Sequence, residues 1–136
     1  MDAARGKREH ITVFGTDYNT ADGTCVRDYI HVNDLATAHV LAMDYLRNGG
    51  ESQVFNLGSG NGFSVKEIIE TAKEVTGIDI PAQYGDRRAG DSGTLIASSE
   101  KIKELLGWDS KFSNVADVIK DAWKWHTSHP DGFKSK

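Results

Sequence analysis

The sequence predicts an α/β fold in which short strands alternate with longer helices. Short β-branched, apolar segments are followed by segments whose apolar residues recur at helical spacing. Hydrophobic residues make up 38% and charged residues 26% of the 136 residues, a composition typical of one globular domain. Only a few short strands are expected, which is a small sheet for helices this apolar. We therefore expect the main sheet of the fold to be missing from this chain.

Two extended segments are expected near the start of the chain. The apolar, β-branched run Ile11–Phe14 ends at Gly15 and predicts a strand. Turn-forming residues fill positions 15–24, which predicts a loop. In residues 26–32 the side chains alternate between two faces, which predicts a strand or extended segment with one polar face. That face carries Arg27, Tyr29 and His31.

A helix and a further strand are expected next. Asn33 or Asp34 can cap a helix whose apolar residues recur at helical spacing, and the pair Gly49–Gly50 ends it. The apolar run Val54–Leu57 predicts a strand of the buried type.

The next helix carries a local start signal. Ser64 and Glu67 have the spacing of a capping box, and Gly77 closes the helix that they open. Residues 81–85 are then expected to form a short strand, and residues 86–93 a charged, glycine-containing loop.

Two helices are expected in the last part of the chain. Leucines and isoleucine at residues 102–106 predict a short helix that ends at Gly107. A longer apolar pattern begins at Val115 and is stopped by His129–Pro130.

Charge and cysteine content limit the classes of partner. The net charge is −4 and the isoelectric point is near 5.7, which gives no general attraction to nucleic acid or membrane. Cys25 is the single cysteine, which fits a reducing cytoplasm. No apolar run approaches the roughly 20 residues of a membrane span, and the N-terminal residues lack a signal-peptide core. We therefore expect a cytoplasmic protein.

Arg27 and Tyr29 are a first candidate anion site. An arginine can pair with a phosphate through two N–H groups, and a tyrosine hydroxyl can add a further hydrogen bond. On these residues alone, however, an ordinary half-buried strand with alternating polar side chains is the favoured interpretation.

A second candidate lies in the charged loop. Arg87 and Arg88 are adjacent, and Asp91 follows three residues after Arg88. Guanidinium groups match phosphate oxygens, and a carboxylate can accept from sugar hydroxyls. A solvated, charged turn would look the same, and both interpretations stay open.

Two further patterns favour structural interpretations. Residues 58–62 are glycine-rich and precede a helix, but they lack the G-x-G-x-x-G spacing, so a tight turn is favoured over a phosphate cradle. His126 and His129 could hold zinc, but no other ligands have convincing spacing. Imidazoles at a helix C-terminus are the favoured interpretation.

Read together, the segments resemble the UDP-glucose 4-epimerases, which are extended short-chain dehydrogenases/reductases. The resemblance covers nearly the whole chain and rests on ordered blocks with the family's spacing. They are GKREHITVFGTDYNTADGTCVRDYIHVNDLATAH, FNLGSGNGFSVKEI, YGDRRAGDSGTLIASSEKIKELLGW and the closing AWKWHTSHPDGF. The DYxTxDGT loop and the W-x-W-H tail point to the epimerase more narrowly than the shared VRDYIHVxDL and RRxGD motifs.

The resemblance implies roles for individual residues. Thr12, Val13 and Phe14 match the segment that lies along the uracil. Arg27 and Arg88 match the two arginines that bind the diphosphate, and Tyr29 stands beside Arg27. The carboxylate on the uridine ribose corresponds to Asp91. At Leu95 the family carries small or bulky residues according to its acceptance of N-acetylated sugars, and leucine is intermediate.

The resemblance also implies what the chain lacks. Family members begin with a Rossmann domain that binds NAD, followed by a Tyr-x-x-x-Lys pair, and no tyrosine of this chain has a lysine four residues on. We therefore expect residues 1–136 to be the C-terminal, UDP-sugar-binding domain of an NAD-dependent isomerase of galactose metabolism. We expect this chain to be inactive alone and to bind no NAD. Its expected partners are a UDP-sugar, the missing Rossmann half and, in the full-length enzyme, a second copy.

Two alternatives to an epimerase portion stay open. One is part of a related sugar-nucleotide 4,6-dehydratase, against which the DGT loop and the tail argue. The other is a stand-alone module that binds a nucleotide sugar without converting it.

One structural expectation tests the interpretation as a portion. In the family, residues 33–62 pack on the Rossmann sheet. We therefore expect an exposed apolar patch at Leu35, Leu41 and Val54–Leu57.

Overall fold

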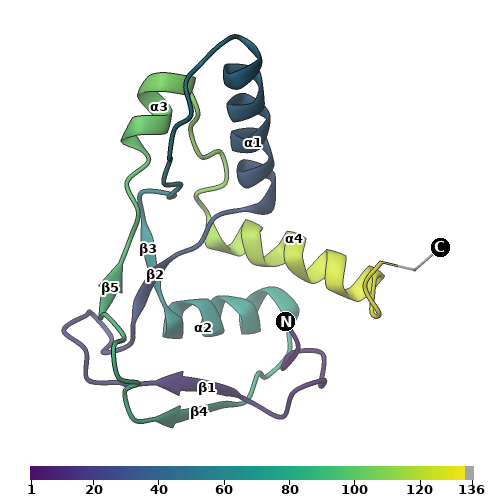
Figure 1. Ribbon diagram of the computed structural model, residues 1–136. Helices are drawn as coiled ribbons and strands as arrows, with labels where there is room; N and C mark the ends of the chain where they lie inside the picture. Colours follow the sequence, from purple (N-terminus) through teal and green to yellow (C-terminus); the bar gives the residue numbers. More distant parts are fainter. Residues whose placement is uncertain (134–136) are drawn as a thin grey trace.

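The computed structural model describes residues 1–133 and has an α/β fold, as predicted. Figure 1 shows α1 and α3 at one end of the molecule and the β1–β4 pair, with α2 beside it, at the other. In chain order the elements are β1 (Ile11–Phe14), β2 (Val26–Asp28), α1 (Val32–Arg47), β3 (Gly62–Ser64), α2 (Val65–Thr76), β4 (Ala82–Gly85), β5 (Thr94–Leu95), α3 (Glu100–Leu106) and α4 (Val115–Ser128).

The strands form two small sheets. β1 and β4 pair in parallel, with Ile11 opposite Ala82 and Phe14 opposite Gly85. In the other sheet β2 lies between β3, to which it is antiparallel, and β5, to which it is parallel. The loop of residues 86–93 runs from one sheet to the other, because it joins β4 to β5.

Each end of the molecule has its own small apolar core. At one end Ala3, Ala4 and Ile80 are buried, and partly buried side chains from β1, α2 and α4 pack against them. At the other end Ala38 of α1 packs with Ile102 and Trp108, and Leu41 lies at the edge of this cluster. The sheets themselves are too small to bury the helices on both faces.

The predicted caps of two helices are confirmed. The Ser64 hydroxyl accepts from the Glu67 N–H, and a carboxylate oxygen of Glu67 accepts from the Ser64 N–H, so α2 begins with a capping box. Gly77 and Gly107 end α2 and α3 in the left-handed conformation that glycine adopts at low cost.

The predicted cap of α1 is wrong. The N-cap is His31, whose Nδ1 accepts from the Asn33 N–H at 3.1 Å, and not Asn33 or Asp34. The carboxylate of Asp34 is used elsewhere: it accepts from the Ser110 hydroxyl and from the N–H groups of Lys111 and Phe112. Asp34 therefore ties the start of α1 to the segment before α4.

Two predicted extended segments end early or do not pair. Of residues 26–32, which were expected to form a strand or extended segment, only Val26–Asp28 form a strand, β2. Residues 54–57 belong to neither sheet, which corrects the strand expected there. A buried-type strand needs neighbours on both edges, and the five strands among residues 1–133 are paired elsewhere.

The expected exposed patch is present in part and extends along another face of α1. Val54 is 82% exposed. In contrast, the side chains of Leu35, Leu41, Phe55 and Leu57 are partly buried. Four other apolar side chains of α1 lie open to solvent, and we call them the α1 stripe: Val32, Val40, Met43 and Leu46. α1 is therefore apolar on two faces, of which one packs on the Trp108 cluster.

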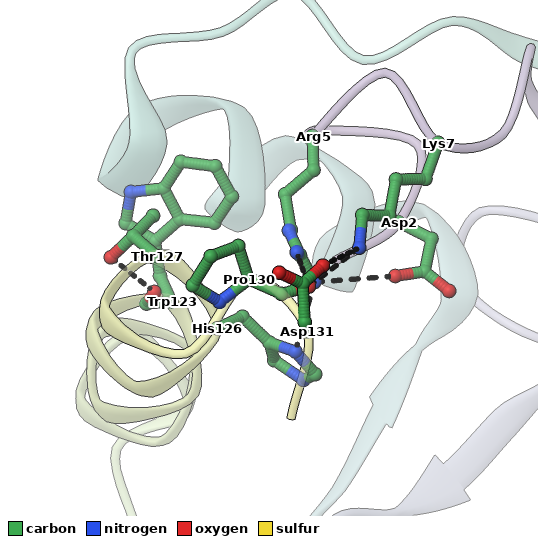
Figure 2. A network of polar contacts seen from close by, with 8 residues as sticks. All are labelled: Asp2, Arg5, Lys7, Trp123, His126, Thr127, Pro130 and Asp131. Carbon is green, nitrogen blue, oxygen red and sulfur yellow. Dashed lines mark hydrogen bonds and ion pairs between the residues drawn. The ribbon is translucent and has the colours of Figure 1, made fainter. Parts of the chain in front are cut away.

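The first and last described segments are tied together by polar contacts (Figure 2). Nη2 of Arg5 and Nζ of Lys7 each donate to the carbonyl of Pro130 at 2.5 Å. Lys7 also lies 3.9 Å from Asp131. Cations beside the last carbonyls of a helix are favourable, so this arrangement stabilises the end of α4. Within residues 1–133 none of the helices is both long and apolar enough to cross a membrane.

Candidate functional site

The candidate site lies where two parallel strands end. β1 ends at Phe14 and β4 at Gly85, and these residues are opposite each other in the register. The charged loop of residues 86–93 begins directly after Gly85. In open α/β sheets, ligands bind beyond the carboxyl ends of parallel strands. The topology therefore brings the arginine loop to the edge at which Phe14 lies.

Arg88, Asp91 and Phe14 lie together at this edge. The Cζ atom of Arg88 is 4.5 Å from the centroid of the Phe14 ring, and its Nε donates to Asp91 Oδ2 at 2.9 Å. The side chain of Arg88 is 60% exposed, so most of its N–H groups face solvent. An exposed guanidinium, a carboxylate and an aromatic ring at one edge can bind an anion, a hydroxyl and a planar ring together.

The neighbouring residues of β1 differ in exposure. Val13 is buried at 2% exposure, whereas Thr12 and Phe14 are exposed. Val13 is therefore held in the core, and a ligand could reach Thr12 and Phe14 by their side chains but Val13 only by its backbone.

Arg27 and Leu95 lie opposite each other in the register of β2 and β5. Nη1 of Arg27 donates to the carbonyl of Val26 at 2.8 Å, and Leu95 is exposed. The Val26 N–H donates to the carbonyl of Gly93, where the charged loop ends. The strand that carries Arg27 is thus hydrogen-bonded to the segment that directly follows the loop of Arg87 and Arg88.

Tyr29 follows β2 and shares the surroundings of Arg27. Burial raises the pKa of the Tyr29 hydroxyl, and the positive charge of Arg27 acts against that rise. Tyr29 therefore stays neutral in the physiological range and can donate a hydrogen bond.

The sequence interpretation missed the side chains around Arg87. Its Nε donates to Asp17 Oδ1 at 2.6 Å, and its Cζ lies 4.1 Å from the centroid of the Tyr18 ring. Both come from the loop after β1, and Asp17 lies seventy positions before Arg87 in the chain. The adjacent arginines and the turn-rich segment were visible in the sequence, but their contact was not.

Asp22 fixes the same loop to α2. Its Oδ1 accepts from the N–H and the hydroxyl of Thr24, and its Oδ2 accepts from the Ser64 hydroxyl at 2.5 Å. Burial opposes ionisation of Asp22, but the hydrogen bonds from Ser64 and Thr24 outweigh it and lower its pKa. The loop of residues 15–24 is therefore held against the start of α2.

The glycine-rich residues 58–62 do not form a cradle for a dinucleotide. The Gly58 N–H donates to the Ser99 hydroxyl, and the Ser59 N–H donates to Asp28. The following helix begins with its own capping box, which occupies free N–H groups at its start. The tight-turn interpretation fits these contacts, and these residues do not fit NAD.

Three of the histidines contact neighbouring side chains of the fold. His126 Nδ1 lies 3.4 Å from Nη1 of Arg5, and His129 stacks on Trp125 with ring centroids 5.0 Å apart. His31 is buried and lies 3.2 Å from Asp121. Within residues 1–133 no three His, Cys, Asp or Glu side chains are grouped as a metal site would require.

Sequence comparison finds similarity to known proteins. Residues 1–58 match the NAD dependent epimerase/dehydratase family. The UDP-glucose 4-epimerase of Halalkalibacterium halodurans is 52% identical over 136 residues, and that of Streptococcus mutans is 54% identical over 136 residues. Each match covers 100% of this chain and 41% of the relative, so the chain spans about two fifths of the length of these relatives.

Solved structures have the same fold. A crystal structure of a UDP-glucose 4-epimerase is similar with a TM-score of 0.93 and 56% identity, over 98% of this chain and 41% of that chain. The UDP-glucose 4-epimerase of Bifidobacterium longum, solved in complex with NAD+ and UDP, has a TM-score of 0.85 and 38% identity over 97% of this chain and 39% of its own. The similarity in sequence spans this whole chain and the similarity in fold spans nearly all of it, so the chain is similar to one portion, about two fifths, of the UDP-glucose 4-epimerases.

Proposed function

We propose that this chain is the C-terminal, UDP-holding part of a UDP-glucose 4-epimerase and is inactive by itself. The observation that carries the proposal is the pairing of Arg88 with Asp91 beside Phe14, at the carboxyl end of β1. A guanidinium that is mostly exposed can pair with a diphosphate, and the adjacent carboxylate can accept from ribose hydroxyls. A uracil ring can lie along the backbone of Thr12–Phe14.

Arg27 is the second diphosphate ligand in this proposal. It lies on the strand that pairs with β5, directly after the Arg88 loop, and Tyr29 is available beside it as a neutral donor. Leu95 is opposite Arg27 and exposed, so it would contact the group that follows the diphosphate, which is the sugar. The size of the Leu95 side chain would then affect whether N-acetylated sugars can be bound.

The chemistry of 4-epimerisation needs groups that this chain does not supply. The C4 hydroxyl must lose a proton to a base, and the hydride must be taken up and returned by a nicotinamide, which NAD supplies when bound. Residues four positions after the chain's tyrosines are Asp22, Asn33, Gly49 and Arg88, so none forms a Tyr-x-x-x-Lys pair. The residues of this chain bind and orient the UDP group.

The missing part is proposed to cover the α1 stripe. Val32 is 69% exposed, and Val40 and Met43 are also open, although a water-exposed helix face is normally polar. A groove of about 450 Å³ lies beside this face, between α1 and the Gly107–Trp108 turn. An NAD-binding Rossmann portion is the proposed occupant, and the complete enzyme is proposed to form a homodimer.

Calorimetric titration of this chain with UDP, and then with UDP-galactose, tests the proposal. We expect weak binding, because half of the pocket is missing. Replacing Arg88 with Ala is expected to weaken binding by about 10- to 100-fold, which corresponds to one charge-assisted interaction, and so to abolish a detectable signal. Arg47→Ala is the matched control, since Arg47 is exposed on α1 and, within residues 1–133, pairs only with Asp44.

Three results would count against the proposal. Turnover of UDP-galactose by the isolated chain would show that no further part is needed for catalysis. Tight UDP binding without the other part would favour a stand-alone nucleotide-sugar-binding module. Equal affinity of the wild-type chain and the Arg88→Ala variant would remove the assignment of the diphosphate site.

A further inference from the structure

The ring of Tyr18 touches both ends of the charged loop of residues 86–93. At the start of the loop, the Arg87 guanidinium lies 4.1 Å from the ring centroid. At its end, Gly93 packs so closely that a Cβ atom there would lie 3.3 Å from Tyr18 Cδ1. Tyr18 is only 7% exposed, so the ring is a fixed surface. Arg88 and Asp91 lie between these two points of attachment.

Arg87 and Arg88 are adjacent but differ in what holds them. Nε of Arg87 donates to Asp17 Oδ1 at 2.6 Å, and its Nη2 donates to the Asp17 carbonyl. Its charge is therefore balanced, and its Nε and Nη2 groups donate to the protein, although the side chain is 46% exposed. Among residues 1–133 the Arg88 side chain donates one hydrogen bond, through Nε, to Asp91 of its own loop, and its guanidinium lies over the Phe14 ring. Of the two arginines, Arg88 is the one free to meet a ligand.

The position of Tyr18 is itself restrained. Its N–H donates to the Gly23 carbonyl at 2.9 Å. Its ring lies against Gly15, where a Cβ atom would come within 2.5 Å of Tyr18 Cε2 and 2.7 Å of Arg87 Cγ. Gly15 also has a φ of 84°, which other residues rarely adopt. Glycine at this position lets the ring and the Arg87 stem pack on the end of β1.

The Tyr18 hydroxyl does not contribute to the contact between the Tyr18 ring and Arg87. It is buried without a hydrogen-bond partner among the described residues. Burial, followed by the neighbouring Cys25, raises its pKa, so the ring stays uncharged at physiological pH. The contact with Arg87 is therefore one between a cation and an aromatic face, which phenylalanine could also make.

We propose that Tyr18, Arg87 and Asp17 are positioning residues, which hold the charged loop so that Arg88 and Asp91 face a nucleoside diphosphate. This inference rests on the proposed function, since that supplies the ligand. It assigns different tasks to two adjacent arginines: Arg88 binds the anion, and Arg87 orders the loop. Ordering before binding lowers the entropy lost when the ligand is held.

A double-mutant cycle with UDP separates positioning from contact. Arg87→Ala is expected to weaken UDP binding about tenfold, because Arg88 and Asp91 must then be ordered by the ligand. In an Arg88→Ala background, the same change is expected to have a clearly smaller effect, since only Asp91 is then left to position. Additive losses would mean that Arg87 contacts the phosphate itself, and would overturn the inference. Nuclear magnetic resonance titration can follow the weak binding expected of this chain.

Conservative variants provide the matched controls. Arg87→Lys keeps the charge but loses the planar fork, so it is expected to weaken binding as Arg87→Ala does. Tyr18→Phe is expected to keep wild-type affinity, whereas Tyr18→Leu is expected to lose it. Full rescue by Arg87→Lys, or equal losses in the Phe and Leu variants, would contradict positioning through the ring.

A measurement without ligand separates failure of this inference from failure of the proposed function. The Asp91 N–H donates to the Arg88 carbonyl at 3.2 Å, so its hydrogen exchange reports on the order of the loop. In Arg87→Ala and Tyr18→Leu, exchange is expected to rise within residues 86–93 while the α2 amides stay protected. Unchanged exchange at Asp91 would overturn the inference, whether or not UDP binds. A loosened loop in a chain that binds no UDP would keep the positioning role and remove only the nucleotide.

Discussion

At the scale of single residues, Asp34 shows how a buried charge can organise several segments. It is 1% exposed, yet both carboxylate oxygens accept hydrogen bonds, from the Ser110 hydroxyl and from the N–H groups of Lys111 and Phe112. Its carbonyl also accepts from Nε1 of Trp108 at 3.0 Å. A buried carboxylate without these partners would be destabilising.

Asp34→Asn is expected to lower the free energy of unfolding by about 2–3 kcal/mol. The amide keeps the shape but turns an NH2 group toward backbone N–H donors, which leaves buried groups unpaired. Chemical denaturation measures the loss. Asp109→Asn is the control, because Asp109 forms an exposed ion pair with Lys103 and is expected to change stability by less than about 1 kcal/mol. Equal effects in the two variants would contradict the role of Asp34.

Asp34 is also expected to make the stability of the chain depend on pH. Burial alone would raise the pKa of Asp34, but the hydrogen bonds from Phe112, Lys111 and Ser110 outweigh it and place the pKa below 3.8. Since the unfolded chain then takes up the proton more readily, stability is present above the unfolded pKa and is lost as the pH falls through the folded one. We expect a smaller loss of stability between about pH 5 and pH 3 in Asp34→Asn than in the wild type, measured by denaturation at each pH.

The residue scale also shows what local sequence cannot reveal. The pair Arg87–Arg88 and the carboxylate Asp91 are visible in the sequence as a possible anion site. Arg87 is the arginine that the protein holds, because Asp17 and Tyr18 contact it. These two residues lie near Arg87 because β1 and β4 are parallel neighbours. The His31 cap of α1 was missed because its imidazole is fixed by Asp121 and by stacking on Phe112, far along the chain.

At the scale of elements, the start of α2 joins helix formation to the candidate site. The Ser64 hydroxyl accepts from the Glu67 N–H and donates to Asp22, which holds the loop of residues 15–24. One side chain thus caps a helix and anchors the segment from which Tyr18 comes.

Ser64→Ala is expected to destabilise the chain by about 1–2 kcal/mol, because it removes both the cap and a partner of a carboxylate. Asn114→Ala is the matched control: in the described part of the chain the Asn114 side chain accepts only from the Ala116 N–H, so a loss of about 1 kcal/mol or less is expected. Thermal unfolding of the two variants measures the difference. A larger loss in Asn114→Ala than in Ser64→Ala would show that the Asp22 bond adds nothing.

Element prediction succeeded where the signal was local. β1, α2 with its capping box, and the glycine ends of α2 and α3 were predicted from adjacent residues alone. The segment Val54–Leu57 has the composition of a buried strand but forms none. Its composition suits a sheet with neighbours on both sides, and among residues 1–133 no strand lies beside it.

At the scale of the whole molecule, the exposed α1 stripe is the feature that the chain's own packing leaves unexplained. Its apolar side chains are open to solvent, whereas the opposite face of the helix packs on Trp108. An exposed apolar surface of this kind favours association.

Replacing Val40 and Met43 together by Gln is expected to leave the free energy of unfolding within about 0.5 kcal/mol per site, since both are exposed. The variant is expected to self-associate less, as measured by sedimentation, and to bind a separately expressed Rossmann portion of a related epimerase less well. Arg47→Gln, on the same helix, is expected to change neither property. If the double variant were unfolded, the α1 stripe would instead be needed for the stability of this chain itself.

The sequence by itself determined the α/β class, the start of α2 with the ends of α2 and α3, and the resemblance to the UDP-glucose 4-epimerases, because these depend on neighbouring residues and on ordered motifs. Only the tertiary structure decided which arginine is free, which residue caps α1, and that Val54–Leu57 stays unpaired. Those outcomes depend on contacts between segments far apart in the chain, such as Arg87 with Asp17 across seventy positions. Such contacts follow from how the strands and helices pack, which no local pattern encodes.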